Sequence, residues 1–397
     1  MTILSAALLA LVAIPVAYLC LLALGALRRP PLPPPTDARI RFGLAVPAHD
    51  EETVIGRTVA GLRSIAYPAE LFDVWVVADC CSDHTAERAR VAGATCLERG
   101  GGLEPGKGAA LGWLFARIRE EGVPYDAMVV FDADTQVDAG FLQAIAARLS
   151  QGEQAVQGQH RVVNPGDGWY PALSDAMFRL NNRIFNQGRV NLALSAMNMG
   201  DSICLRSDLL RDIGWGEGLT EDYDLRLRLL LCGVRIAYEP AAVGYGEAPQ
   251  TWAAARRQRE RWLVGVHRSG RAHLGSLVRQ AARRPNALLL DGIARIVLPS
   301  YSTLTLLTAA GLVVQVGLAA LGWVDIPAAL LWAWLGILVL LVAYPFFGLA
   351  LDRAPRRAFA AALTGPAFVL WRTWLALLLR LGGAANTWVR TPRRRMR

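Results

Sequence analysis

The sequence predicts an α/β protein built on a mixed, mainly parallel sheet, with membrane helices at both ends of the chain. Three observations predict this arrangement. Between residues 40 and 132, short apolar runs alternate with segments of helical character, which is typical of a parallel sheet covered on both faces. Polar clusters follow the apolar runs, and both ends carry long uncharged stretches. With 397 residues, the chain is long enough for more than one domain.

The composition narrows the class of protein. Hydrophobic residues make up 53% of the chain, and the excess is concentrated at the two ends. The net charge is +9, and the basic residues gather beside apolar segments, so we expect membrane lipids rather than nucleic acid as the counterpart. Six cysteines without a CxxC pair argue against a zinc site or a disulfide framework and are typical of a reducing compartment.

The chain is predicted to begin with an N-terminal transmembrane helix over residues 1–28. Its apolar run carries no charge and ends at Arg28 and Arg29, which places that end in the cytoplasm. A cleaved signal peptide would carry its positive charges before the apolar run instead. Residues 29–39 form a stiff proline-rich linker, and a cytosolic domain is predicted over residues 40–270.

The first half of this domain alternates between strands and helices. Strands are predicted at residues 39–47, at 72–77 and before Asp132, and helices at 53–65, 85–92 and 109–121. The carboxyl ends of parallel strands meet at one edge of a sheet, where open α/β sheets bind ligands. We therefore expect one rim suited to a nucleotide, with acids for base and ribose, and a lysine and a metal for phosphate. The polar residues at these strand ends and loops are Asp50, Glu51, Asp79, Lys107, Asp132 and Asp134.

The Asp132-Ala133-Asp134 pair directly follows a buried apolar strand. Ligands that are all oxygen suit hard ions, so Mg2+ or Mn2+ is the expected cofactor. The alternative is that the pair caps the next helix, because Asp is a common N-cap. The sequence contains no GxGxxG or P-loop signature, so a dinucleotide or an ATP-hydrolysis site has little support.

The second half of the domain adds three polar segments. After a helix at residues 175–187, a small loop containing Gly200 and Asp201 leads into a strand. Glu221 and Asp222 then open a helix, where the macrodipole alone would also favour acids. A basic helix at residues 252–268 places Gln258, Arg261 and Trp262 on one face, which suits phosphate and sugar contacts. The alternative for this helix is a basic face on anionic lipid.

Beyond the domain, the chain returns to membrane segments. Residues 271–299 are predicted as interfacial helices, and residues 300–351 as two transmembrane helices separated by a tight turn. Residues 352–397 are predicted as a basic loop, a re-entrant or interfacial segment and a basic tail. Arg372 interrupts that segment, and a further span would export the tail against the positive-inside rule.

These motifs together resemble the membrane-bound family 2 glycosyltransferases. That family includes cellulose, hyaluronan and chitin-oligosaccharide synthases and the ceramide glucosyltransferases. The resemblance covers residues 40–262 and implies a GT-A fold, a nucleotide-sugar donor, most simply a UDP-sugar, and an inverting transfer. The motifs that carry it are Val46-Pro47-Ala48-His49-Asp50-Glu51-Glu52, Ala78-Asp79, Gly106-Lys107-Gly108, Asp132-Ala133-Asp134, Thr220-Glu221-Asp222 and Gln258-Arg259-Glu260-Arg261-Trp262.

The resemblance also implies a role for each site residue. The acceptor side would be formed by Trp262 with Gly200 and Asp201. In the first motif, this chain has Asp50 where the family usually has an Asn. The loop at residues 200–204 does not match the acceptor loop of the cellulose synthases, so the acceptor stays open. The remaining implied roles are nucleoside contacts for Asp50, Glu51 and Asp79, donor contacts for Lys107, Gln258 and Arg261, diphosphate and metal contacts for Asp132 and Asp134, and the catalytic base for Asp222 with Glu221 beside it.

Three functions follow as hypotheses. The first is sugar transfer to a growing polysaccharide at the cytoplasmic face of the inner membrane, which would need a channel. Three spans are few for a channel unless copies of the chain combine into a homo-oligomer. The second is transfer of a single sugar to a membrane lipid. The third, a non-catalytic nucleotide-sugar receptor, is disfavoured because every polar cluster carries chemically competent residues.

Overall fold

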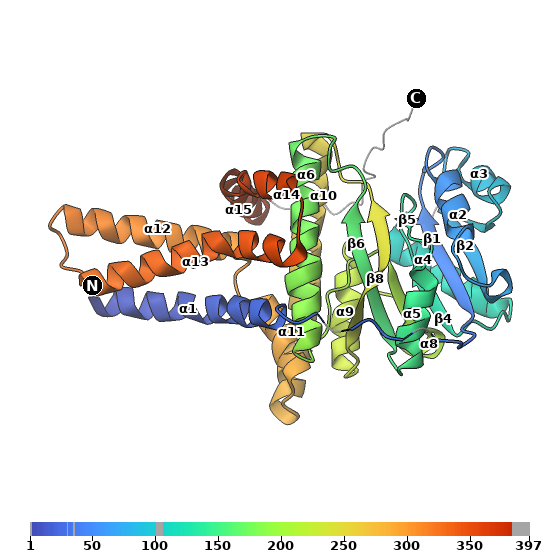
Figure 1. Cartoon of the computed structure of the whole chain (residues 1–397), viewed down its shortest axis with the longest axis horizontal. Helices are drawn as coiled ribbons and strands as arrows, with labels where there is room; N and C mark the ends of the chain where they lie inside the picture. The colour runs from blue at the N-terminus through green and yellow to red at the C-terminus, as the bar shows by residue number, and fades with distance from the viewer. Residues whose placement is uncertain (1, 30, 35, 101–105, 383–397) are drawn as a thin grey trace.

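The computed structural model places a sheet domain beside a bundle of long helices, with α6 and α10 standing between them (Figure 1). The structure describes residues 2–29, 31–34, 36–100 and 106–382. Pro30 and Pro35 of the predicted linker, Pro105 before the Lys107 helix, and residues 383–397 of the predicted basic tail lie outside the described residues.

The sheet domain is built on eight described strands in the order β3-β2-β1-β4-β7-β6-β8-β5. Neighbours are parallel at β3-β2, β2-β1, β1-β4 and β6-β8 and antiparallel at the other three contacts, which confirms the predicted mixed, mainly parallel sheet. The strands are β1 (Phe42–Ala48), β2 (Phe72–Asp79), β3 (Thr95–Arg99), β4 (Ala127–Val130), β5 (Gln136–Val137), β6 (Ala155–Val162), β7 (Ile203–Arg206) and β8 (Ile236–Gly246).

Helices cover both faces of this sheet. They are α2 (Ile55–Arg63), η1 (Ala69–Leu71), α3 (Thr85–Val91), α4 (Lys107–Glu120), α5 (Phe141–Ser150), α6 (Trp169–Leu180), the π-helix η2 (Asn181–Gly188), α7 (Arg189–Asn191), α8 (Ser207–Ile213) and α9 (Glu221–Leu231). The end of β4 shows why the sheet is buried on two sides. Val129 and Phe131 pack toward α2 and α5, whereas Met128 and Val130 pack toward α4 and α9.

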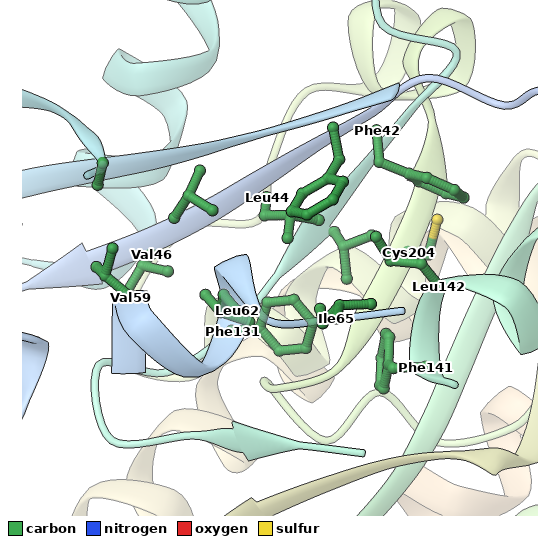
Figure 2. Close-up of a cluster of buried hydrophobic side chains, with 14 of the residues drawn as sticks. Phe42, Leu44, Val46, Val59, Leu62, Ile65, Phe131, Phe141, Leu142 and Cys204 are labelled. Carbon is green, nitrogen blue, oxygen red and sulfur yellow. The ribbon is translucent and has the colours of Figure 1, made fainter. Parts of the chain in front are cut away.

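The core on the α2 and α5 side gathers around Phe131 (Figure 2). The rings of Phe131 and Phe141 lie 5.0 Å apart in an edge-to-face arrangement. Full burial of a side chain of this size is worth about 1.5–3 kcal/mol. The residue immediately before Asp132 is therefore fixed in the core, which holds the acidic pair at the rim.

Several elements differ from the sequence-based expectation. Strands β3, β5, β6 and β8 were not predicted, and the helix predicted at residues 175–187 begins at Trp169 and becomes a π-helix at Asn181. Helix α10 (Trp252–Arg283) continues past the domain boundary expected near residue 270. It continues because Leu277 and Ala281 bury their side chains against α9 and α11 (Ala287–Val297).

Three described helices are long and apolar enough to cross a membrane: α1 (Thr2–Gly25), α12 (Tyr301–Ala320) and α13 (Ala328–Asp352). They pack against one another (Figure 1), and Trp334 of α13 donates a hydrogen bond of 3.3 Å to Ser5 Oγ of α1. Ser5 in turn donates to Gln315 of α12. A fourth segment, α14 (Arg356–Ala362) with α15 (Gly365–Gly382), is bent by 50° at its break. Such a pair is either a broken span or a re-entrant loop, so the predicted re-entrant segment stays a prediction.

Helix α1, the first candidate membrane span, packs directly on the sheet domain through two glycines. A Cβ atom at Gly188 of η2 would lie 2.3 Å from the Leu22 carbonyl oxygen of α1, and one at Gly25 would lie 2.6 Å from the Gly188 carbonyl oxygen. With a side chain at Gly25 or Gly188, the backbones of α1 and η2 could not approach each other so closely. The sheet domain is therefore held against the end of α1.

Candidate active site

One pocket at the rim of the sheet collects nearly all of the residues singled out from the sequence. It contains about 1450 Å³ of space, counting its open mouth, which is ample for a nucleotide-sugar. Asp50 and Asp201 are not part of its lining. The predicted residues that line it are Glu51, Asp79, Lys107, Asp132, Asp134, Gly200, Glu221, Asp222, Gln258, Arg261 and Trp262.

Lys107, the first residue of α4, joins three segments in the pocket. Its Nζ atom lies 2.5 Å from Asp132 Oδ1 and 3.6 Å from Glu221 Oε1, and it also donates to the Gly200 carbonyl oxygen. Burial lowers the pKa of Lys107, but the charges of Asp132 and Glu221 outweigh it and raise this pKa above its ordinary value. The lysine therefore stays positively charged, which suits a contact with phosphate.

Asp132 and Asp134 both face this pocket, and α5 begins only at Phe141, so the pair does not cap the next helix. Asp134 is buried, and its Oδ2 accepts a hydrogen bond of 3.1 Å from the Glu247 backbone N–H. The Asp132 side chain is 41% exposed. A buried, oriented carboxylate beside an accessible one is an oxygen-only donor set, which fits a hard divalent cation.

Glu221 and Asp222 lie in the first turn of α9. Burial, and after it the charge of Glu221, raise the pKa of Asp222 to about 7. Gly200 lies against this carboxylate with φ at +78°, and a Cβ atom there would sit 3.4 Å from Asp222 Oδ2. Glycine both adopts this backbone conformation and leaves space beside Asp222. A carboxyl group with a pKa near neutrality is suited to proton transfer.

Helix α10 closes the opposite wall of the pocket with Gln258, Arg259, Arg261 and Trp262. Arg259 stacks over the Trp262 ring at 4.9 Å and donates to the Tyr170 hydroxyl at 3.2 Å. Within the described parts of the chain, Arg261 has no hydrogen-bond or ion-pair partner. Its guanidinium is therefore available to an anionic ligand.

The first two motifs are tied together at the nucleoside end of the predicted site. His49 Nδ1 lies 2.6 Å from the Asp79 carbonyl oxygen, and because a carbonyl can only accept, Nδ1 carries the proton. Asp79 pairs with Arg99 and accepts a 2.8 Å bond from the Gly106 N–H. Asp50 has φ at +53° and accepts a 2.6 Å bond from the Ser82 N–H. Asp and Asn both tolerate this left-handed conformation, which accounts for Asp where Asn is usual.

Asp201 lies behind the pocket wall, which differs from the acceptor-side position expected for it. It is 1% exposed, and its Oδ1 accepts hydrogen bonds from the Asp132 N–H at 3.1 Å and the Thr135 hydroxyl at 2.9 Å. Its Oδ2 lies 2.9 Å from His160 Nδ1. Burial lowers the pKa of His160, but the hydrogen bond to Asp201 outweighs it and raises this pKa. Asp201 therefore orients groups that face the pocket.

Sequence reasoning missed four residues of this site: His160, Glu247, Arg99 and Arg259. His160 and Arg99 belong to strands that were not predicted, and Glu247 follows β8. Arg259 stands inside the Gln258-to-Trp262 motif, so its place between two pocket residues was the available signal.

Comparison with known proteins places the chain in a family. The sequence model described as "Glycosyltransferase like family 2" matches residues 38–265. The probable glycosyltransferase YdaM of Bacillus subtilis is 26% identical over 57% of this chain and 55% of its own length. The beta-monoglucosyldiacylglycerol synthase of Synechocystis is 28% identical over 56% of this chain and 47% of its own length. The chain thus spans about half the length of these curated relatives.

A solved structure extends the likeness in fold. The mannosyltransferase PcManGT of Pyrobaculum calidifontis, determined in complex with GDP-Man and Mn2+, has a TM-score of 0.57 and is 19% identical. The match covers 94% of this chain and 99% of that one, so it includes the helices outside the sheet domain. The chain therefore belongs to glycosyltransferase family 2 and has the GT-A fold.

Proposed function

We propose that the protein transfers one sugar, with inversion, from a nucleotide-sugar to a membrane lipid at the cytoplasmic face of the inner membrane. The observation that carries the proposal is that Asp132, Asp134, Asp222 and Arg261, from three distant parts of the chain, line one pocket. A nucleotide-sugar presents a diphosphate beside an electrophilic carbon, and these residues supply groups for both.

Asp222 is the proposed general base. It would remove the proton from the attacking hydroxyl of the acceptor, a contribution of typically 10²–10⁴-fold. One base is enough for a direct displacement that inverts the anomeric carbon. Lys107 and Arg261 would hold the departing diphosphate, and Gln258 would orient it. A Mg2+ or Mn2+ ion held by Asp132 and Asp134 would supply further neutralisation of charge on that leaving group.

The two ends of the pocket suggest where each substrate lies. Glu51 and Asp79 follow the first two strands and would face the nucleoside, for which a UDP-sugar is the simplest donor. Trp262 and Gly200 would face the acceptor, and Asp201 would orient Asp132 and His160 from behind. Arg259 stacks on Trp262 and also lies 5.3 Å from the Phe368 ring of α15. The acceptor side is thus next to a helix of the C-terminal apolar region.

The packing of the long helices favours a lipid acceptor. The described helices α1, α12 and α13 are joined by the hydrogen bonds among Ser5, Gln315 and Trp334. A polymer channel would have to pass outside this closed trio or use a second copy of the chain. The similarity to monoglucosyldiacylglycerol synthases also supports a lipid. Polysaccharide synthesis, the first expectation from sequence, is the second candidate because family members such as glucomannan 4-beta-mannosyltransferase 7 of Arabidopsis are also similar.

A product assay on the full-length protein tests this proposal. Detergent-purified protein would be incubated with a panel of radiolabelled nucleotide-sugars, Mn2+ or Mg2+, and a membrane lipid extract. We expect release of nucleoside diphosphate from one donor and label in the organic phase. A high-mass, water-soluble polymer would overturn the lipid acceptor and favour polysaccharide synthesis. Binding of a donor without diphosphate release in any combination would overturn the enzymatic proposal.

A further inference from the structure

A second cavity lies at the inner end of the long helices, away from the sheet rim. It is bounded by α1, η2, α11, α12 and α15. Its apolar wall includes Pro15, Leu19, Phe185 and Leu298, and its polar wall includes hydroxyls of Tyr18 and Ser302. Tyr18 is seven residues from the end of α1 at Gly25, or about 10 Å along the helix axis. The cavity thus lies near the end of α1 that packs on the sheet domain.

Three arginines line this cavity: Arg189, Arg295 and Arg372. Arg189 is fully buried; it donates to Asp291 and to the Tyr18 hydroxyl, yet its Nε atom has no hydrogen-bond partner in the described chain. Arg372 donates to Ser300 Oγ at 2.7 Å. Arg295 has no ion-pair or hydrogen-bond partner among the residues described by the structure.

The positive charge of this cluster exceeds the negative charge bonded to it. Asp291 is the one carboxylate bonded to these arginines in the described chain, and it is shared with the fully buried Arg226 at 3.1 Å. The charges of Arg259 and Arg295 act on Arg372, so the charged neighbours of Arg372 are positive as well. Arg189 is buried and paired with Asp291, whereas Arg372 is half-buried and Arg295 is exposed. The positive charges of Arg295 and Arg372 are therefore accessible to an anion.

The start of α12 adds a second feature that suits an anion. Ser300, Tyr301 and Ser302, at its N-terminus, line the cavity, and Ser300 caps the helix. Helix N-termini and guanidinium groups both bind phosphate, through free N–H groups and paired donors respectively. The apolar wall on the other side suits an acyl or isoprenoid chain rather than water.

We propose that this cavity binds the phosphate group of an anionic membrane lipid. Arg295 and Arg372 hold the phosphate against the start of α12, and the chain of the lipid lies along the apolar wall formed with α1. The site goes beyond the proposed function, because a bound phospholipid need not be the molecule that accepts the sugar. It also places a lipid in contact with Arg189, which α7 holds next to the first membrane helix.

Lipid binding to the full-length protein in detergent tests the site. Thermal stabilisation and native mass spectrometry would be measured with phosphatidylglycerol, with diacylglycerol of the same chains, and with inorganic phosphate. We expect a larger stabilisation and more bound adduct with phosphatidylglycerol than with diacylglycerol. Equal effects of the two lipids would overturn the phosphate site, and full stabilisation by inorganic phosphate alone would overturn the lipid as its source.

A matched pair of variants locates the binding. The double variant Arg295→Gln/Arg372→Gln should bind phosphatidylglycerol at least about tenfold more weakly, because it removes two charged hydrogen-bonding groups. Arg356→Gln/Arg357→Gln removes the same charge from exposed positions of α14 that do not line the cavity, and it should bind like the wild type. Arg295→Gln alone provides a variant of an exposed side chain, should the double variant fold poorly. Unchanged binding in Arg295→Gln and in the double variant would overturn the proposal.

Discussion

The two pockets of this protein gather opposite charges. The sheet-rim pocket is lined by seven carboxylates, from Glu51 to Glu247, with cations set among them. The second cavity, the membrane-side cavity, is lined by three arginines and, among the residues that the structure describes, by no acid. The proposed donor, an anionic nucleotide-sugar, would enter this acid-rich pocket only where cations offset the acids, which is the role proposed for Lys107 and a divalent ion. The membrane-side cavity can receive an anion directly. The two proposals thus place a phosphate group in two pockets that differ in charge.

The largest effect is expected from Asp222→Asn, which removes the proposed base but keeps its size. The rate of transfer should fall by about 10²–10⁴-fold, while donor affinity stays within a few-fold, because the base acts on the acceptor. Turnover and calorimetric donor binding would be measured on purified protein. Asp224→Asn is the control, since Asp224 lies in the same turn but bonds His273 and does not line the pocket. Near-normal turnover in Asp222→Asn would show that the base is another residue.

The membrane-side region is expected to respond in stability rather than in chemistry. Asp291→Asn leaves the fully buried Arg189 and Arg226 without their shared carboxylate. Loss of one partner of a buried pair costs about 3–5 kcal/mol, so the melting temperature in detergent should drop markedly. Asp325→Asn, in the exposed turn between α12 and α13, should not change it. A wild-type melting temperature for Asp291→Asn would mean that the two arginines have other counterions.

A smaller effect of a single substitution is expected among the proposed metal ligands of the sheet-rim pocket. Chelation with EDTA should abolish transfer, and Mn2+ or Mg2+ should restore it. Asp134→Asn should raise the metal concentration needed for half-maximal activity by about 10–100-fold or more, since even residues that only support a ligand have effects of this size. Asp138→Asn, at an exposed acid just after β5, is the control. Full activity after chelation would remove the metal from the proposal.

The contrast between the two pockets also shows what the sequence could predict. Strands β1, β2 and β4 are apolar because both of their faces are buried, so the acids that follow them could be assigned to one rim in advance. Strand β6 was missed because it carries the polar residues Gln157, Gln159 and His160; the two glutamines are buried, and His160 is half-buried. Asp201, which bonds Gln157 and His160, was expected at the acceptor side because contacts between residues so far apart in sequence leave no local pattern.

The membrane-side cavity could not be predicted from the sequence. Arg189, Arg295 and Arg372 lie on three helices that are far apart in sequence, and each alone resembles an ordinary basic residue near a membrane. Asp291 and Arg295 did suggest a helix here, which is α11, and its interfacial position stays a prediction. The packing of α1 on η2 through Gly25 and Gly188 places Tyr18 beside Arg189, and no local sequence pattern signals that contact.

The smallest expected effect concerns the pH dependence of the sheet-rim pocket. As a base, Asp222 works only when ionised, so with its pKa raised to about 7 the value of kcat/KM should fall as the pH drops below that value. The charge of Glu221 contributes to this raised pKa, after burial. Glu221→Gln removes that charge, which lowers the pKa of Asp222 and should move the acid limb of the profile to lower pH. Glu217→Gln, an exposed acid before α9, should leave the limb in place. A limb that moved to higher pH in Glu221→Gln would assign the titration to a group other than Asp222.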